Sequence, residues 1–420
     1  MAFKIVLVEN PNYRRSGIKS YVHLMRKYRL HPTKDGPYSI GRAFYQTGRP
    51  FTTKPIGGRV RFHDVIKKRL SENEMQQVEP DDIQNDAPFF TPVSMGTPAQ
   101  SLNLILDTAS PDMWVQSSEL PADALPQGRE RNHTFDAEKS NTFKASEESS
   151  WKISSIDNSS VSGTIGIDNI TIGGVAIKTQ PVQLAKTISQ AFTQSSADGV
   201  LGLGFGDTSS TGQDVKSLAE RLLTSGDLEP SAKLFTAKLG SWGDSGLKQP
   251  FCTVGYIDQN AVGYCGHDIH RTPIDNSRGY WMFDSASATI AGEARTRSKN
   301  KAVVDTDAAL TLLDDQTCQA IYDSIPGTLY DRESQGFLIP TGIDAEKLPA
   351  IQLAVGEKSF AILKESLLFA EARPGYVYGG VQSRGSLEFD VLGRTFLEGI
   401  YAIFDIGSLQ FSVIQARTEE

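Results

Sequence analysis

The chain has 420 residues, of which 39% are hydrophobic, so it is long enough for two or three domains with sizeable cores. It contains no apolar run of about 18 residues, which excludes a predicted membrane-spanning helix, and its three cysteines are too few for a disulfide scaffold. The net charge of -8 is unevenly spread: residues 1–70 hold 16 Lys and Arg against 3 Asp and Glu, and the remainder holds 26 against 47.

The basic N-terminal segment comes first in chain order. Its stretch GIKSYVHLMRKYRL (17–30) is predicted to be helical. A free basic arm would suggest nucleic acid, but an acidic body is covalently attached, so we expect intramolecular docking and no nucleic-acid or membrane partner. The first 15 residues lack the apolar region and cleavage site of a secretory signal. The sequence therefore favours an intracellular protein, or a secreted or vacuolar one if a leader has been removed.

Beyond residue 80 the sequence is mostly short alternating strands broken by Gly, Pro, Asn and Asp, which predicts a mostly-β protein. Examples are QSLNLIL (100–106), GTIGIDNITIGGVAI (163–177), FCTVGYI (251–257) and YAIFDI (401–406). Helices are expected at DVKSLAERLLTSG (214–226), with Asp214 as N-cap and Gly226 as its stop, and at DDQTCQAIYDSIPG (314–327).

An internal repeat organises this β-rich part. LILDTAS, with Asp107, recurs as AVVDTDA, with Asp305, and each copy is followed by a second shared element, VLGLGF or VLGRTF. The second element begins 93 residues after Asp107 and 86 residues after Asp305. Two related halves in the same order predict two lobes related by a pseudo-twofold axis, each contributing one Asp-Thr loop to a cleft between them.

Two carboxylates at such a junction have a defined chemistry. Like charges at short range cannot both ionise easily, so one carboxyl group acts as a base while the other acts as an acid. Such a pair activates water and protonates a carbonyl oxygen at once. Asp107 and Asp305 are therefore the predicted catalytic pair.

From about Asp86 to Ile414 the chain resembles the pepsin-like aspartic proteases of the fungal type. The resemblance rests on FFTPVSMGTPAQSLNLILDTASPDMWVQSSEL (89–120), HTFDAEKSNTF (133–143), SADGVLGLGF (196–205), DNSRGYWMF (275–283) and DVLGRTFLEGIYAIFDIGSLQFSVIQ (390–415). It implies a bilobal acid-protease fold with an Asp107/Asp305 dyad. It also implies that Thr108 and Thr306 lock the loops together and that Ser110 and Trp114 support the first loop.

Residues 3–33 resemble the family's propeptide, in which a Lys-Tyr pair, here Lys27 and Tyr28, reaches the carboxylates. The predicted division is a propeptide-like segment and linker at 1–80, an N-terminal lobe at 81–272 and a C-terminal lobe at 273–420. The basic run KKRL (67–70) is interpreted as either a processing site or a solvated loop.

The sequence departs from the family pattern at both loops and at the flap. The family's Asp-Thr-Gly is broken by Ala109 in the first loop and by Asp307, followed by Ala308, in the second. Glycine lets backbone approach both carboxylate and substrate, whereas Asp307 adds a third acid to the cleft. In the flap, ISSIDNSSVSG (153–163), Ser155 stands at the usual Tyr, and Ile156 and Asn158 flank Asp157 where glycines are usual. We expect these flap residues to line a cleft whose flap tip is stiffer and differently shaped.

Three functions remain open. The favoured hypothesis is a dyad enzyme repurposed for a small-molecule step of fungal secondary metabolism, such as dehydration or cyclisation. The alternatives are an acid endopeptidase and an inactive, peptide-binding pseudoprotease. We expect a monomer with a small-molecule or peptide substrate. We also expect no cofactor and no metal, because the sequence lacks the spacings of phosphate-loop, dinucleotide-binding and zinc-binding motifs, and GHDIHR (266–271) offers only two histidines. The three cysteines are either free or include a Cys252–Cys265 bridge.

Overall fold

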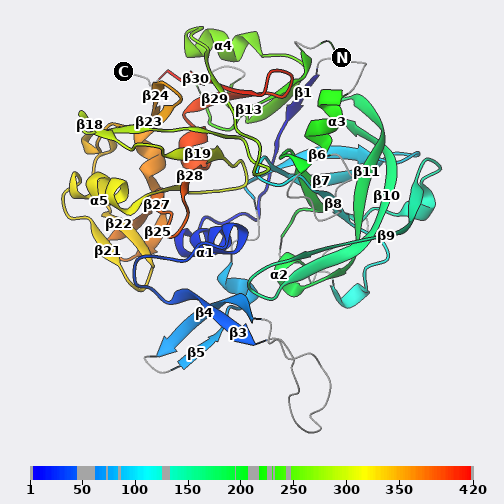
Figure 1. The fold of residues 1–420 in the computed structure, drawn as a ribbon, viewed down its shortest axis with the longest axis horizontal. Helices are drawn as coiled ribbons and strands as arrows, with labels where there is room; N and C mark the ends of the chain where they lie inside the picture. The colour runs from blue at the N-terminus through cyan, green and yellow to red at the C-terminus, as the bar shows by residue number, and fades with distance from the viewer. Residues whose placement is uncertain are drawn as a thin grey trace.

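The computed structural model describes residues 3–44, 62–71, 74–83, 87–124, 133–193, 195–206, 217–224, 229, 232–242 and 247–417. The protein is mostly β, as predicted, with two halves on either side of helix α1 (Gly17–Tyr28) (Figure 1). The other α-helices are short: α2 (Gln190–Thr193), α3 (Leu218–Thr224), α4 (Gln259–Cys265), α5 (Asp315–Asp323) and α6 (Arg394–Leu397). None of the helices in the described ranges combines the length and the apolar character needed to cross a membrane.

The first half is built on one eight-stranded sheet. Its strand order is β2 (Val8–Glu9), β6 (Phe89–Met95), β7 (Gln100–Asp107), β12 (Gly199–Gly202), β8 (Met113–Gln116), β11 (Val175–Ile188), β10 (Ser160–Ile172) and β9 (Lys144–Ser154). Strands β7, β8 and β12 contribute side chains to the largest core cluster, while Ile105 of β7 and Trp114 of β8 belong to smaller apolar clusters, so both faces of these strands carry apolar side chains.

The second half contains three smaller sheets. One is β16 (Met282–Asp284), β19 (Lys301–Val304), β28 (Phe389–Leu392), β20 (Thr311–Leu313) and β27 (Val381–Ser383). Another is β18 (Glu293–Thr296), β17 (Ser287–Ile290), β23 (Ile351–Val355) and β24 (Lys358–Ile362). The third is β21 (Leu329–Asp331), β22 (Gly336–Pro340), β26 (Tyr376–Gly379) and β25 (Leu368–Arg373).

The internal repeat corresponds to a repeated strand pairing. In the first half, β7 runs into Asp107 and pairs in parallel with β12, which holds the start of VLGLGF. In the second half, β19 precedes Asp305 and pairs in parallel with β28, which ends in the start of VLGRTF. Each aspartate thus lies at the end of a buried strand, and that strand pairs with the second element of the same repeat.

A six-stranded sheet joins the two halves. Its order is β1 (Phe3–Val6), β14 (Phe251–Val254), β13 (Leu234–Lys238), β29 (Ile400–Asp405), β30 (Gln410–Gln415) and β15 (His270–Pro273). The predicted lobe boundary at 272/273 falls in β15, so this sheet contains strands from both proposed lobes and from the N-terminal segment. The division into three parts stays a prediction.

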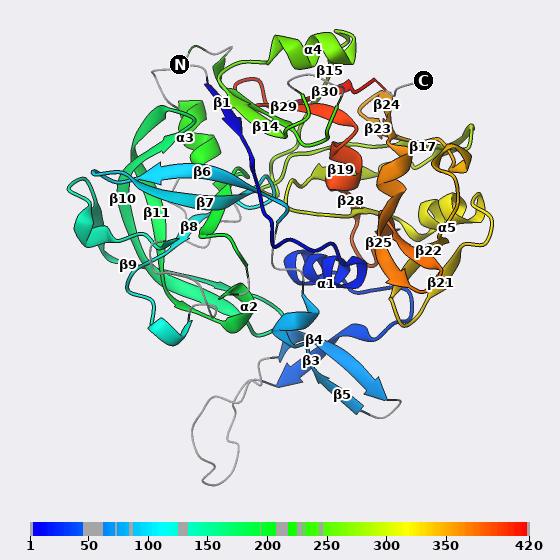
Figure 2. The same ribbon diagram turned by 180° about the vertical axis from the view of Figure 1, so that it is seen from behind.

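The N-terminal segment crosses the molecule. From the rear, β1 runs down the middle and leads to α1, beyond which lies a three-stranded sheet (Figure 2) of β3 (Tyr38–Phe44), β4 (Phe62–Ser71) and β5 (Glu74–Gln77). The apolar face of α1 is buried in a cluster that also holds residues of the second half such as Val391. The helix ends at Tyr28 because Arg29 takes a left-handed conformation, with φ of 52°.

Several local expectations can be compared directly. The predicted helices are present at α1, α3 and α5, although Asp214 and Gly226 lie outside the described residues. The run KKRL lies within strand β4, so the interpretation as a solvated loop was wrong. All three cysteines are free and buried, so no Cys252–Cys265 bridge forms.

Candidate active site

The two Asp-Thr loops meet at the centre of the molecule and hold each other. The backbone N–H of Thr108 donates to Thr306 Oγ1, and that of Thr306 donates to Thr108 Oγ1, both at 3.2 Å. Each hydroxyl then donates across to the other half, Thr108 to the carbonyl of Val304 at 2.9 Å and Thr306 to that of Leu106 at 2.7 Å. This reciprocal set fixes the two loops symmetrically.

The two catalytic candidates are deeply buried and partly satisfied by their own loops. Asp107 is 5% exposed and Asp305 is fully buried. Asp107 Oδ1 accepts from the backbone N–H of Ala109 at 2.8 Å. Asp305 Oδ1 accepts from the N–H groups of Asp307 at 2.9 Å and Ala308 at 3.1 Å. The loop backbone therefore orients both carboxylates toward the same point.

That point is occupied by helix α1 of the N-terminal segment, residues 1–80, which is called the arm below. Lys27 Nζ lies 2.9 Å from Asp107 Oδ1, 2.9 Å from Asp305 and 3.1 Å from Asp307 Oδ2. Tyr28 donates its hydroxyl hydrogen to Asp305 Oδ2 at 2.8 Å. The arm thus covers the predicted dyad and brings the Lys27 ammonium and the Tyr28 hydroxyl onto its carboxylates.

Burial and charge set the protonation of these groups. Burial, with help from Asp305 and Asp307 and against the Lys27 ammonium, raises the pKa of Asp107 to about 7. Burial disfavours the Lys27 ammonium, but Asp107, Asp305 and Asp307 outweigh it and raise the pKa of Lys27 well above 10.5. Burial and Asp305 raise the pKa of the Tyr28 phenol, which therefore remains a donor. In the docked form burial thus favours the neutral state of Asp107.

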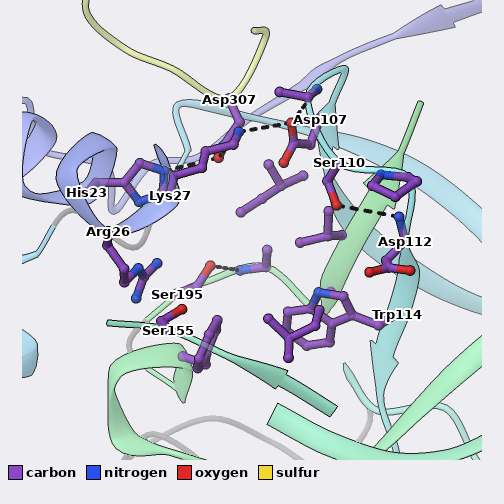
Figure 3. Close-up of a pocket in the computed structure, with 18 of the residues that line it drawn as sticks. His23, Arg26, Lys27, Asp107, Ser110, Asp112, Trp114, Ser155, Ser195 and Asp307 are labelled. Atoms are coloured by element: carbon purple, nitrogen blue, oxygen red, sulfur yellow. Dashed lines mark hydrogen bonds and ion pairs between the residues drawn. The ribbon is translucent and has the colours of Figure 1, made fainter. Parts of the chain in front are cut away.

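Asp307 belongs to this cluster and brings in a residue that the sequence analysis missed. His23 Nε2 lies 3.1 Å from Asp307 Oδ2, one helical turn before Lys27 on the same face of α1 (Figure 3). Burial would raise the pKa of Asp307, but Lys27 and His23 prevail and hold it well below 3.8. The spacing of four residues between two basic side chains was the available signal.

The three carboxylates also form the arrangement a cation could use. Oxygens of Asp107, Asp305 and Asp307 all lie within 4.8 Å of one another. In this structure the ammonium of Lys27 is the positive charge among them. Carboxylate oxygens alone suit a hard divalent ion, but here their observed partner is an organic cation.

A cavity of about 540 Å³ lies beside Asp107 with the arm in place. Its walls include Ala109, Ser110, Trp114 and Ser155, together with Asp307 and arm residues (Figure 3). Trp114 packs between Trp151 and Phe192, with ring centroids 6.3 Å and 6.2 Å away. The carbonyl oxygen of Ser110 accepts from the N–H of Gly204 at 2.8 Å, which fastens the end of the first loop.

The flap between β9 and β10 is tied to the arm at its tip. Ile156 is buried, and its carbonyl oxygen accepts from the N–H of Ile66 at 2.9 Å. Asp157 is also buried and lies 3.7 Å from Arg26 Nη1. Asn158 takes a left-handed φ of 66°, which Asn tolerates better than most residues. Of the four predicted flap residues, only Ser155 lines the cavity.

Ala308 is covered while α1 is docked. Its side chain is fully buried and shares an apolar cluster with Tyr28 and Val391. Its backbone carbonyl accepts from the N–H of Arg394 at 2.8 Å. Ala308 therefore packs beneath Tyr28 in the docked form, and Asp307 adds the new charge to the second loop.

Comparison with known proteins agrees with this geometry. Residues 88–416 match the family model of eukaryotic aspartyl proteases, so the chain belongs to that family. It is 30% identical over 322 residues to aspergillopepsin-1 of Aspergillus oryzae, covering 76% of this chain and 77% of the relative. It is 32% identical over 324 residues to rhizopuspepsin-1 of Rhizopus niveus, covering 77% and 78%.

A relative from Aspergillus fumigatus, described as aspergillopepsin A-like, is 31% identical over 396 residues and covers 88% of this chain and 87% of its own. Residues 88–416 alone are too few to supply that share. The similarity therefore extends into the N-terminal segment that carries α1.

Proposed function

We propose that this protein hydrolyses peptide bonds with the Asp107/Asp305 dyad once the N-terminal segment has left the cleft. The observation that carries the proposal is the reciprocal threonine lock, which holds two buried carboxylates facing one point. Relatives named as pepsins that share about three quarters of the chain support a peptide substrate.

The chemistry follows from the shared proton. The ionised carboxylate takes a proton from water as the oxygen attacks the peptide carbonyl carbon, and the protonated carboxyl group donates to the carbonyl oxygen. Collapse of the tetrahedral intermediate breaks the C–N bond, and the leaving nitrogen takes up a proton. Since Lys27 occupies this position, the docked form is inactive on peptides.

The test is cleavage of an acid-denatured protein by the purified full chain at acidic pH. We expect cleavage that is blocked by a statine-type peptide inhibitor and strongly reduced in Asp107→Asn. Cleavage by Asp107→Asn at the wild-type rate would show a contaminating protease. A complete lack of cleavage by the wild-type chain, with the arm removed in the same sample as seen by mass spectrometry, would disprove the peptidase proposal.

A second candidate is the dehydration or cyclisation of a small molecule of fungal secondary metabolism. The cavity of about 540 Å³ beside Asp107, with Ser155 at its wall, favours it, because that space remains open while the arm is docked. The ion pairs of Lys27 with both carboxylates count against chemistry in the docked form.

Two experiments discriminate between the two candidates: a double substitution assayed on peptides, and Asp305→Asn assayed on the metabolites of the host. Ser155→Tyr with Asp307→Gly restores the family pattern at the flap and the second loop, and we expect it to raise peptide cleavage. If the metabolite profile of the host responds to Asp305→Asn while no peptide is cleaved, the small-molecule function is correct. If Asp305→Asn leaves the metabolite profile unchanged and no peptide is cleaved, the dyad is idle and the chain is a peptide-binding pseudoprotease.

A further inference from the structure

The cavity beside Asp107 is built jointly by the arm and the first half of the molecule. Its arm wall is basic and consists of His23, Arg26, Lys27 and Arg29. Its opposite wall carries the apolar side chains of Ile105, Trp114, Ile153, Phe192 and Val200. The compartment therefore exists in this form only while the arm is docked.

Arg26 brings unused hydrogen-bond donors to this compartment. Its side chain is 9% exposed, and its Nη1 has no hydrogen-bond acceptor among the described residues. Asp157 Oδ2 lies 3.7 Å from that nitrogen, which is too far for a hydrogen bond. Burial lowers the pKa of Arg26 against the opposing effects of Asp157 and Asp307. A buried guanidinium in this situation favours a closer anionic partner.

The acids of the compartment leave space for an anion near Arg26. Asp107 and Asp307 are paired with the Lys27 ammonium at 2.9 Å and 3.1 Å. The other acid among the lining residues is Asp112, and Figure 3 shows Asp112 and Arg26 on opposite sides of the cavity. The end of the compartment at Arg26 is thus its anion-accepting end.

The rings beside Arg26 define the rest of a suitable ligand. The Cζ atom of Arg26 lies 5.0 Å from the ring centroid of Phe192, and Phe192 packs edge-to-face on Trp114 at 6.2 Å. A flat aromatic body packs well against such rings, and a carboxylate attached to it matches the paired donors of a guanidinium. The volume of about 540 Å³ is within the range of small-molecule sites, roughly 300–1,000 Å³.

We propose that the docked form binds an aromatic carboxylate in this compartment, with the carboxylate on Arg26 and the aromatic body against Phe192 and Trp114. The ligand is bound and not converted, because Lys27 holds both catalytic carboxylates. Since it contacts the arm and the first half at once, it stabilises the docked arm and delays its release. The inference concerns the docked form and does not depend on the peptidase function.

The test uses the full chain at neutral pH and two fluorescent probes, naphthoate and the corresponding naphthalenemethanol, which share the ring system and differ in the carboxylate. Fluorescence titration measures the dissociation constants. We expect naphthoate to bind about tenfold to a hundredfold more tightly, which is the size of a hydrogen bond to a charged group. Saturating naphthoate should also increase the protection of residues 17–28 from hydrogen exchange.

Two variants with opposite expected effects identify the carboxylate site. Arg26→Gln removes the guanidinium, so the preference for naphthoate should fall to about one. Asp157→Asn removes the carboxylate that competes for Arg26 and keeps an acceptor for Ser159, so naphthoate should bind more tightly. Loosening of the arm alone would weaken binding in both variants. Arg14→Gln is the control, because Arg14 is an arm residue outside the cavity whose Nη1 donates to the carbonyl groups of Pro11 and Tyr13.

Three results overturn the proposal. The first is equal affinity of the wild-type chain for the two probes, or no binding of either. The second is a preference for naphthoate that survives in Arg26→Gln. The third is weaker binding of naphthoate in Asp157→Asn, which would mean that the probe reports only on how firmly the arm is docked. Each of these results leaves the peptidase function unaffected, because that function is measured at acidic pH after the arm has left the cleft.

Discussion

The two Asp-Thr loops are the same in how they are held and different in what they contact. Both are fixed by the same pair of threonine hydrogen bonds, and both follow a strand paired in parallel with the second repeat element. Beyond that the first loop presents the methyl group of Ala109, whereas the second presents the carboxylate of Asp307 and also receives Tyr28 and His23. The way the loops are fixed is thus shared, whereas most of the polar contacts with α1 are made by the second loop.

The largest expected effect tests the shared part. Asp107→Asn and Asp305→Asn each remove one member of the acid–base pair, and we expect each to lower turnover by about 10²- to 10⁴-fold. Kinetics on a denatured-protein substrate at acidic pH measure the loss, with circular dichroism as the folding control. A large loss in only one variant would show that the two loops do not act as a pair.

Lys27 is the contact common to both loops. Lys27→Met keeps the length of the side chain but leaves three carboxylates facing a neutral group, which we expect to weaken docking of α1 by about 3–5 kcal/mol. Hydrogen exchange of residues 17–28 at neutral pH measures this, and unchanged protection would mean that the ion pairs contribute little. Tyr28→Phe is the matched control, because it removes a single neutral donor to Asp305.

Acid should release the arm through the second loop. The docked state holds the pKa of Asp307 well below 3.8, so its contribution to docking is fully present above that pH and is lost as the pH falls below it. We expect protection of α1 from hydrogen exchange to decline below about pH 4. In Asp307→Gly the decline should be shallower, and an identical profile would assign acid release to other groups.

The threonine lock should show the smallest and most symmetric effect. Thr108→Val and Thr306→Val each leave a buried backbone N–H without its acceptor, so we expect each to lower the free energy of unfolding by about 1–3 kcal/mol. Urea unfolding provides the measurement. Because the two residues share one network, the double variant should lose less than the sum, and strict additivity would argue against a joint lock.

The internal repeat allowed the two central aspartates of the site to be predicted from the sequence. Two copies of a strand ending in Asp-Thr, each followed by a second shared element, located Asp107 and Asp305, and the resemblance to pepsins added Lys27 and Tyr28. A mostly-β fold followed from the short alternating strands. The fold prediction is confirmed, and the structure brings these four residues together. Each inference depended on a local pattern that occurs twice or on a motif with known spacing.

Other parts depended on contacts between distant segments. The spacing of His23 from Lys27 places both on one face of a helix, but no local pattern identifies Asp307, 284 residues away, as the partner of His23. Nor does any local pattern identify Ile156 in the flap as the partner of Ile66. Ala308 follows an acid in a cleft loop, and its complete burial in the docked form depends on contacts with α1 and α6, which lie far away in the sequence. Such placements are set by tertiary packing, which one sequence without long-range information does not specify.

The pairing of β1 with β14 affects how well a substrate can compete with α1 for the cleft. Val6 is fastened to the six-stranded sheet, and only residues 7–16 separate it from the start of α1. A helix on so short a tether has an effective concentration of about a millimolar at its own site. A substrate arriving from solution cannot outcompete such a neighbour by mass action at ordinary concentrations. Opening the cleft therefore requires a change in the charges that hold α1, or a cut in the chain that ends the tether.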